Sequence, residues 1–203
     1  MLPLALDLSE WPVLLVGDGR AALARLDMLR AAGARRLTVF AEDPSAAMRE
    51  RAGPRLVERL PTDAEVAEAR VLFTAGLDDS TTERLATLAR AHRVLVNAED
   101  VPPFCDAYAL AMVRRGNLVI GVSTEGRSPA VARVLRQWLE RRFGPEWEGR
   151  FEQAVALRQE LRARGAEPAE ITGATAELLE PWLAPAEERA PEGGAAGLPQ
   201  PAA

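Results

Sequence analysis

The sequence predicts an α/β fold with a Rossmann-like, doubly wound parallel sheet, followed by a small α+β segment and a C-terminal helical part. Three observations support this prediction. A glycine-rich turn joins a buried apolar run to a helical pattern at residues 13–22. Short apolar runs then alternate with helical stretches up to residue 97. Beyond that point the alternation stops and proline-rich and helical stretches follow.

The glycine-rich turn at residues 17–22 has the spacing G-x-G-x-x-A of a dinucleotide-binding fingerprint. Gly17 permits the tight turn, Gly19 lets a pyrophosphate approach the backbone, and Ala22 lets the helix lie close to the strand. The amides at the start of this helix, which runs on to Gly33, would face the phosphates. The alternative is a glycine turn in an α/β protein that binds no dinucleotide.

A second strand is predicted at residues 36–41, where β-branched and aromatic residues gather. Glu42 and Asp43 follow it, where such folds place the acid that binds the adenosine ribose. An acid there favours NAD over NADP because it would repel a 2′-phosphate. Asp43 has a second interpretation as the cap of the next helix, and the two are compatible.

Further short elements complete the alternation, and an additional strand is predicted before the fingerprint at residues 3–8. Ligands of parallel sheets bind beyond the carboxyl ends of the strands. The predicted site is therefore lined by residues 17–22, 42–43, 75–79 and 97–103. The remaining predictions are helices at residues 46–51, 64–68 and 80–92 and strands at residues 55–60, 71–75 and 93–97.

The second half of the chain predicts less regular structure. A turn at residues 114–117 leads into a strand at 118–123, and Ser128-Pro129 is a typical helix start. Two more helices are predicted at residues 147–164 and 169–180, the second ended by Pro181. The chain is thus divided into a nucleotide-binding domain (1–112), a central segment (113–145), a helical domain (146–183) and a disordered tail (184–203).

Composition limits the function classes. The net charge of −5 gives no basic surface for nucleic acid, and no apolar run approaches the ~20 residues that cross a bilayer. The N-terminus lacks the basic region of a signal peptide. The single cysteine, Cys105, excludes an intramolecular disulfide and fits a reducing cytoplasm, and the single histidine, His92, excludes a histidine-rich metal site. We expect a cytoplasmic protein with no resident metal.

Three stretches carry a resemblance to a known family: residues 13–22, residues 94–106 with the pattern V-N-x-x-D-x-P…C-D, and residues 118–133 with the turn S-T-x-G-x-S-P. Together they resemble the NAD-dependent precorrin-2 dehydrogenases, also found as the N-terminal module of siroheme synthase. The resemblance covers about residues 2–165. The third stretch is much more specific than the glycine fingerprint.

The resemblance implies oxidation of precorrin-2 to sirohydrochlorin with NAD⁺ in siroheme biosynthesis, in some members with Fe²⁺ insertion by the same site as a sirohydrochlorin ferrochelatase. It also implies a homodimer, which makes residues 113–145 the dimerisation segment. By position, Asp100 matches the active-site general base, and Ser128 matches a serine near the tetrapyrrole that is phosphorylated in some relatives. The predicted cofactor contacts are Gly17, Asp18, Gly19, Arg20, Ala21, Ala22, Glu42, Asp43, Ala75 and Asn97.

The chain also departs from the family pattern. Residues 21–25 replace the usual V-A-x-R-K, and residues 75–79 and 107–111 differ from the family's loops. Glu125 takes the place of a glycine. This carboxylate adds a negative charge near a polyanionic substrate, which opposes tight binding or chelation.

The residues themselves support the same chemistry. Hydride removal needs a proton acceptor, and Asp100 stands in a proline-stiffened loop at the ligand edge, with Asp106 as a second carboxylate. The alternatives are an exposed turn residue for Asp100 and a cap for Asp106. Cys105 is expected to be packed rather than reactive. A polyanionic substrate needs cations or a helix N-terminus, which Ser128, Arg114, Arg115, Arg127 and Arg133 offer, although each arginine is also explained as part of a solvated face.

Two other functions remain open. One is a non-catalytic NAD-binding module that senses redox state, and the other is an oxidoreductase on a different substrate. A sensor would normally lack the Asp100 loop and the S-T-x-G-x-S-P turn and would carry a DNA-reading domain, so an enzyme is favoured. The methyltransferase step that supplies precorrin-2 is expected in another polypeptide.

Overall fold

The computed structural model describes residues 1–184. They form two compact units, which are described separately. The first unit comprises Met1–Ala111 and Val122–Arg133, and the second comprises Met112–Gly121 and residues 134–184. The division into four segments remains a prediction, and the predicted disordered tail lies, from residue 185, outside the described residues.

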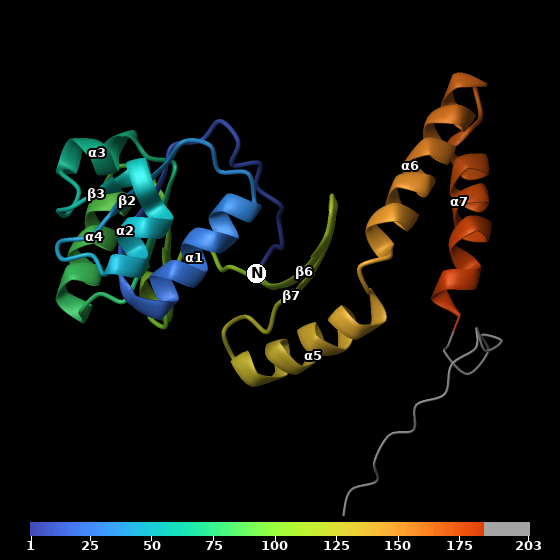
Figure 1. Ribbon diagram of the computed structural model, residues 1–203. Coiled ribbons are helices and arrows are strands. Elements are labelled where there is room, and N and C mark those ends of the chain that lie inside the picture. Colours follow the sequence, from blue (N-terminus) through green and yellow to red (C-terminus); the bar gives the residue numbers. More distant parts are fainter. Residues whose placement is uncertain (185–203) are drawn as a thin grey trace, which may run out of the picture. The chain divides into compact units, whose positions relative to one another are not determined.

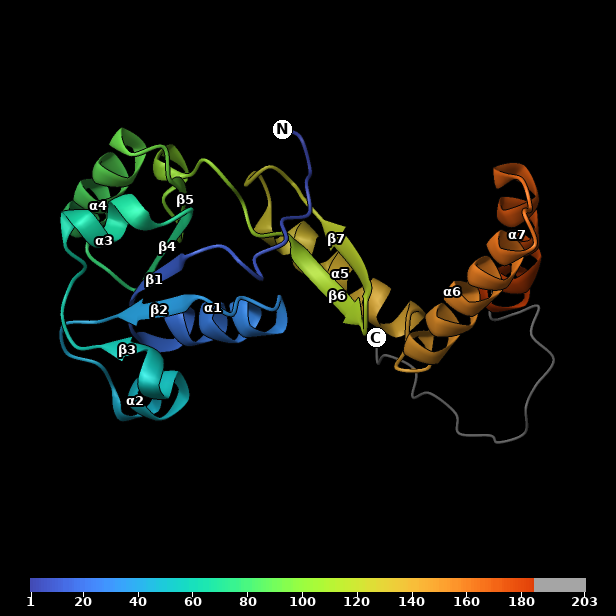
Figure 2. The same ribbon diagram turned by 90° about the horizontal axis from the view of Figure 1, so that it is seen from above.

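The first unit is built on a five-stranded parallel sheet, drawn in blue and green at the left of Figure 1. The strand order is β3-β2-β1-β4-β5, as labelled in Figure 2. Because β2 and β3 lie on one side of β1 and β4 and β5 on the other, the strand order reverses between β1 and β4. In doubly wound sheets this reversal marks the ligand crevice. The predicted fold class is therefore confirmed. The strands are β1 (Val13–Gly17), β2 (Leu37–Phe40), β3 (Leu56–Val57), β4 (Val71–Ala75) and β5 (Leu95–Ala98).

Two helices cover each face of this sheet (Figure 2). On one face, α1 (Gly19–Ala31) and α2 (Ala46–Ala52) bury Leu26, Leu29 and Met48 completely. On the other face, α3 (Asp63–Glu68) and α4 (Asp79–Ala91) bury Val66 and Leu85. Short 3₁₀ turns, η1 (Gly53–Arg55) and η2 (Pro102–Phe104), complete the unit. Strands β1 and β4 are buried along their whole length, as a parallel sheet covered on both faces requires.

Side chains cap the N-termini of three of these helices. The hydroxyl of Ser45 accepts the amide of Met48 at the start of α2. Thr62 and Glu65 form a reciprocal capping box at the start of α3. Asp78 accepts the amide of Thr81 at 2.8 Å at the start of α4. These caps satisfy amides that have no partner within the helix.

The strand predicted at residues 3–8 is wrong. No strand forms there; Leu4 is 69% exposed and Leu6 is 40% exposed, while Leu8 alone joins the core. Alternating leucines stabilise a strand only where a neighbouring strand pairs with it, and within the described residues this segment has no such neighbour.

Beyond the sheet, β6 (Ala111–Arg115) and β7 (Leu118–Val122) form a hairpin, with Gly116 in the left-handed region at φ 54°. The strand predicted at 118–123 is confirmed, whereas Arg114 and Arg115, predicted in the turn, belong to the unpredicted strand β6. Helix α5 (Pro129–Arg142) follows. In the second unit the guanidinium of Arg115 donates to the carbonyls of Phe143 at 2.8 Å and Glu140 at 3.2 Å. It thereby closes the C-terminal end of α5.

An aromatic cluster joins α6 (Trp147–Ala163) and α7 (Pro168–Leu183) in the second unit. The Trp147 ring lies 4.8 Å from Phe143 and 6.4 Å from Trp182 between ring centroids. The guanidinium of Arg150 lies over both indoles, at 5.5 and 5.2 Å. Only Trp147 and Leu161 are buried among the described residues of α6 and α7.

Pro181 does not end the last helix as predicted, since α7 continues to Leu183. A proline removes one amide donor, and the amide of Ala184 still bonds to the carbonyl of Glu180 at 3.1 Å. The last turn therefore tolerates it.

Candidate functional site

Two glycines interlock the carboxyl ends of β1 and β4. Gly17 has φ 126°, and a Cβ atom there would lie 1.8 Å from the carbonyl oxygen of Ala75. Gly76 has φ 69°, and its Cβ would lie 2.1 Å from the carbonyl oxygen of Asp18. Neither position accepts a side chain, because the neighbouring backbone occupies the space. The first glycine of the fingerprint is thus required by the protein's own packing.

Gly19 differs, because its surroundings are open. It has φ 82°, and no heavy atom lies within 4 Å of the position of its missing Cβ. Helix α1 begins at this residue, and the side chain of its N-cap, Asp18, caps none of the helix amides that follow Gly19. The first turn of α1 therefore presents amides beside open space, which is the arrangement that receives a phosphate. The structure fits a dinucleotide pyrophosphate here.

Asp18 ties this turn to the next one. Its carboxylate accepts the amide of Ser45 at 2.6 Å and the Ser45 hydroxyl at 3.0 Å. Burial alone would raise the pKa of Asp18, but hydrogen bonds from the Gly19 and Ser45 amides and the Ser45 hydroxyl outweigh it and lower the pKa. The carboxylate of Asp18 therefore stays ionised and holds the β1–α1 and β2–α2 turns together.

The remaining predicted contacts of this turn line the same edge. Arg20 is exposed, Ala21 is half-buried and Ala22 is fully buried against the sheet. Glu42 and Asp43 are exposed just beyond β2. The alternative in which Asp43 caps the next helix is wrong, because Ser45 is the N-cap of α2. The ribose-binding role thus remains as the prediction for these two carboxylates.

Asn97, near the end of β5, carries an unsatisfied buried atom. Its side chain is 5% exposed, and its Nδ2 donates to the carbonyl of Ala107 at 2.8 Å. Its Oδ1 has no hydrogen-bond partner among the described residues, and the same holds for the hydroxyl of Thr74 on β4. Buried polar atoms without partners are uncommon and often belong to ligand sites. Ala75, also predicted as a contact, is buried at the end of β4.

Asp100 lies in the loop after β5, where the backbone is unusual. Its φ is 54°, in the left-handed region, and its side chain is exposed. The preceding residue is fixed to the sheet, because the amide of Glu99 bonds to the carbonyl of Thr74 at 2.9 Å. The following prolines form the turn η2. Non-glycine residues in this conformation persist where the surroundings hold them, often at functional sites.

Asp106 and Cys105 have structural roles. Asp106 accepts the amide of Val96 on β5 at 3.2 Å and pairs with Arg90 on α4 at 3.0 Å, so it ties its loop to these two elements. The thiol of Cys105 donates to the carbonyl of Ala98 at 3.0 Å. Burial raises the pKa of Cys105, which keeps it as a thiol. The expectation of a packed cysteine is confirmed, and its low reactivity stays a prediction.

Sequence reasoning missed Arg25 on α1. Its guanidinium is partly buried and lies 6.0 Å from the Phe73 ring centroid; within residues 1–184 it donates only to the sulfur of Met28, at 3.8 Å. Phe73 on β4 is the register partner of Asn97 on β5. Burial lowers the pKa of Arg25, and the negative charges of Glu99 and Asp100 oppose that shift. In the sequence, Arg25 stands next to Leu26, at the margin of the apolar face of α1. This position was the only indication that its side chain would be partly buried.

The predicted substrate contacts fall in both units. In the first unit, Ser128 accepts the amide of Val131 at 3.4 Å and so caps α5, as predicted, and Arg127 is exposed beside it. Arg114 is exposed on β6 in the second unit. Arg115 does not have a free guanidinium, because it donates to backbone carbonyls at the end of α5. Its proposed availability to a substrate is wrong.

Within residues 1–184, no three His, Cys, Asp or Glu side chains gather to hold a metal ion. None of the helices described here combines the length and apolar character that a bilayer span demands.

Comparison with known proteins adds three findings. Residues 4–111 match a protein family described as putative NAD(P)-binding. A siroheme synthase of Methylococcus capsulatus is 36% identical over 171 residues, which are 82% of this chain and 36% of the relative. A siroheme synthase of Nitrosococcus oceani is 33% identical over 167 residues, 80% of this chain and 35% of the relative. The chain thus spans about a third of the length of these curated relatives.

A solved structure of SirC, a precorrin-2 dehydrogenase, has the same fold. The match has a TM-score of 0.68 at 20% sequence identity and covers 88% of this chain and 89% of that one. At this identity the likeness concerns the fold.

Proposed function

Because this chain belongs to the putative NAD(P)-binding family and to the group of precorrin-2 dehydrogenases and siroheme synthases, we propose that it oxidises precorrin-2 to sirohydrochlorin with NAD⁺. The reaction removes one hydride and one proton from the reduced tetrapyrrole. Bound NAD⁺ supplies the hydride acceptor. The chain must therefore hold the dinucleotide, receive the proton and position a substrate that carries many carboxylates.

One observation carries the cofactor part of the proposal: the open space at Gly19 beside the uncapped start of α1. The amides there donate to the pyrophosphate, and the small residue Ala22 keeps α1 close to the sheet. Glu42 and Asp43 accept hydrogen bonds from the adenosine ribose and disfavour a 2′-phosphate. Asn97 offers a buried acceptor atom without a partner at the same edge.

We propose that the carboxylate of Asp100 accepts the proton that leaves the tetrapyrrole. A carboxylate at the ligand edge can accept a proton from the tetrapyrrole as the hydride leaves. The bond between Glu99 and Thr74 and the turn η2 keep the loop in place on either side of it. A fixed general base lowers the entropic cost of reaching the reactive geometry.

Substrate carboxylates need cations, and Arg25 is the strongest candidate in the first unit. A guanidinium has five donors, and among the described residues the one hydrogen bond of Arg25 goes to the thioether sulfur of Met28. A carboxylate of the tetrapyrrole would satisfy those donors in a bidentate pair. Arg127 and the α5 N-terminus at Ser128 provide further anion contacts in the same unit, and Arg114 stays a predicted substrate contact.

Two finer proposals accompany the dehydrogenase. Fe²⁺ insertion into sirohydrochlorin releases two pyrrole protons, and Asp100 would accept them, with Fe²⁺ as a substrate. The second of these proposals is a homodimer. It would cover the exposed apolar side chains of α5, where Val134 is 61% exposed and Trp138 is 53% exposed. Trp138→Glu should then lower the mass found by analytical ultracentrifugation; an unchanged mass would refute this dimer.

The test is an anaerobic assay of NADH formation from precorrin-2 and NAD⁺, with Asp100→Asn as the variant. Asparagine tolerates the left-handed backbone, so the loop should persist. We expect kcat to fall by roughly 10²–10⁴-fold, the usual contribution of a general base, with unchanged NAD⁺ affinity. NAD⁺ binding without turnover of any tetrapyrrole by the parent protein would favour a redox-sensing module instead. Chelation is followed separately with Fe²⁺ or Co²⁺ and sirohydrochlorin.

A further inference from the structure

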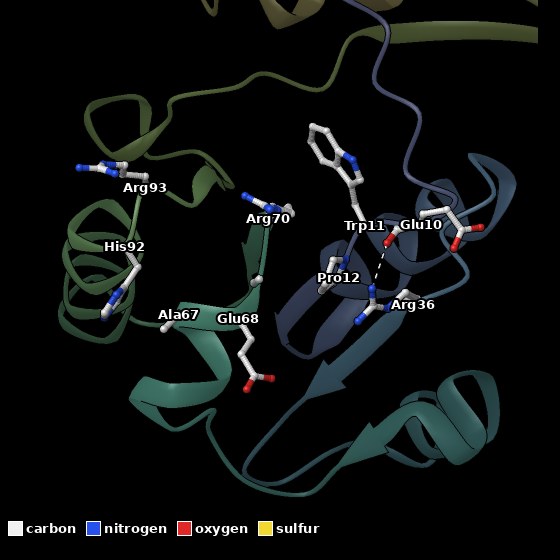
Figure 3. Close-up of a pocket in the computed structure, with 10 residues that line it drawn as sticks. Glu10, Trp11, Pro12, Arg36, Ala67, Glu68, Arg70, His92 and Arg93 are labelled. Carbon is white, nitrogen blue, oxygen red and sulfur yellow. Dashed lines mark hydrogen bonds between the residues drawn. The ribbon is translucent and has the colours of Figure 1, made fainter.

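A cavity lies at the edge of the sheet opposite the proposed nucleotide site, where the strands begin (Figure 3). Its volume of about 540 Å³ is in the range of small-molecule sites. Three arginines line it, and each comes just before a strand: Arg36 before β2, Arg70 before β4 and Arg93 before β5. The nucleotide chemistry proposed above uses the other edge and leaves this cavity unexplained.

The backbone holds these arginines in fixed positions. The amide of Val13 donates to the carbonyl of Arg36 at 2.9 Å, and the amide of Arg70 donates to the carbonyl of Pro12 at 2.9 Å. The carbonyl of Arg70 accepts the amide of Leu95 at 3.1 Å. Arg36 and Arg70 are therefore joined directly to the sheet, whereas the amide of Arg93 bonds to the carbonyl of Arg90 in α4 at 3.0 Å. These bonds fix the backbone from which the three side chains extend.

The cavity has more positive than negative groups. Within residues 1–184, none of the three guanidinium groups forms an ion pair. Arg36 donates to the backbone carbonyl of Glu10 at 3.2 Å, while the Glu10 carboxylate pairs with Arg35 outside the cavity. Glu68 is the one other carboxylate of the lining. An anionic ligand would compensate this excess of charge.

Arg93 is also held in a conformation that favours glycine. It follows His92, the C-cap of α4, and has φ 59°. Glycine is the usual residue at this place after a helix because it has no Cβ. An arginine here costs stability, so a function of its guanidinium would explain the residue.

We propose that this cavity binds a small organic anion with at least two phosphate or carboxylate groups. The guanidiniums of Arg36, Arg70 and Arg93 receive the anionic groups, and the organic part lies along Trp11. In the view of Figure 3, Arg70 stands between Trp11 on one side and Arg93 on the other. Guanidinium groups bind phosphate and carboxylate alike in bidentate pairs, so the two ligand classes share this chemistry. The proposal is independent of the proposed dehydrogenase function.

A purely structural role competes with it. Helices α3 and α4 end at Glu68 and Ala91, beside the cavity, and cations near helix C-termini stabilise a fold. If the arginines only neutralise the partial negative charge at these helix C-termini, removing one of them lowers the stability of the fold and changes no ligand binding. The variant Arg93→Gly separates the two roles, because it removes the guanidinium and also relieves the strained backbone.

The experiment is isothermal titration of the full chain with citrate and, separately, with pyrophosphate, both with and without saturating NAD⁺. We expect at least one probe to bind in the presence of NAD⁺, with affinity that falls as NaCl is added. Arg93→Gly should weaken it about tenfold without lowering Tm, and Arg70→Ala combined with Arg93→Gly should abolish it. Arg84→Ala, an exposed arginine on α4 outside the cavity, is the matched control and should bind like the parent.

Each outcome decides the proposal. Binding of pyrophosphate alone identifies a phosphorylated ligand, and binding of citrate alone identifies a polycarboxylate. The proposal is overturned if neither probe binds at low salt, or if affinity is the same in the double variant. It is also overturned if NAD⁺ displaces the probe and Arg20→Ala weakens it, because the probe then occupies the nucleotide edge.

Discussion

The two units of this chain differ in how completely they bury their apolar residues. Strands β1 and β4 are buried along their whole length, with helices on both faces of the sheet. In α6 and α7 only Trp147 and Leu161 are buried, and Leu135 and Trp138 of α5 stay 43% and 53% exposed. The nucleotide-binding unit therefore closes its own core, whereas the helical unit relies on one aromatic cluster. We therefore expect a substitution in one unit to change the stability or function of that unit and to leave the other unit unaffected.

The largest effect is expected from Gly17→Ala in the closed unit. Its Cβ would lie 1.8 Å from the carbonyl oxygen of Ala75, at a φ of 126° that alanine rarely adopts. Overpacking and backbone strain together should cost roughly 4–6 kcal/mol, a large part of a domain's stability. Chemical denaturation followed by circular dichroism measures this. A loss below 1 kcal/mol would show that the β1 and β4 ends separate easily.

Trp147→Ala should have the next largest effect, confined to the helical unit. It removes the centre of the contacts with Phe143 and Trp182 and the face on which Arg150 lies. We expect a loss of about 3 kcal/mol, at the lower end for such truncations because the buried Nε1 has no partner among the described residues. Hydrogen exchange should report the loss in α6 and α7 alone.

Trp147→Phe is the matched control. It keeps a ring in the cluster and removes the unsatisfied Nε1, so its loss should be clearly smaller. If Trp147→Ala also raised exchange in β1 and β4, the two units would not be energetically separate.

Gly19→Ala should affect binding more than stability. Nothing lies within 4 Å of the added Cβ, so the cost is the backbone strain at φ 82°, about 1 kcal/mol. The methyl group would occupy the space proposed for the pyrophosphate, and NAD⁺ affinity should fall at least about tenfold. Titration calorimetry measures it, with Gly33→Ala as the control, another open glycine at φ 78° away from the edge. Equal NAD⁺ affinity in both variants would contradict the proposed site.

The sequence predicted those features that depend on neighbouring residues. Apolar periodicity located the strands of the sheet, and the pair Ser128-Pro129 marked the start of α5. The features it missed depend on distant partners. The leucines at 4 and 6 alternate as in a strand but have no strand beside them, and Pro181 is tolerated because it falls near the end of α7.

The same limit applies to charged residues. Arginines look alike in a sequence, yet Arg115 closes the end of α5, while Arg25 is partly buried against Phe73. Arg70 and Arg93 share a cavity only because β4 and β5 are neighbours in the sheet. Their roles follow from strand order and packing, which single-residue patterns do not encode.

The smallest expected effect is a pH dependence of the stability of the first unit, through the capping box at the start of α3. The guanidinium of Arg59, followed by the amide and hydroxyl of Thr62, lowers the pKa of Glu65 from 4.5 to about 2. Because the folded pKa is lower than the unfolded one, this carboxylate stabilises α3 above pH 4.5, and the contribution disappears as the pH falls to about 2. It should be less than about 1 kcal/mol, since the side chain is 33% exposed and screened by solvent. The Tm of Glu65→Gln should therefore be lower than that of the parent protein at pH 7, and the difference should shrink near pH 2.5. A Tm difference for Glu65→Gln that stays constant between pH 7 and pH 2.5 would mean that the capping box adds nothing through its charge.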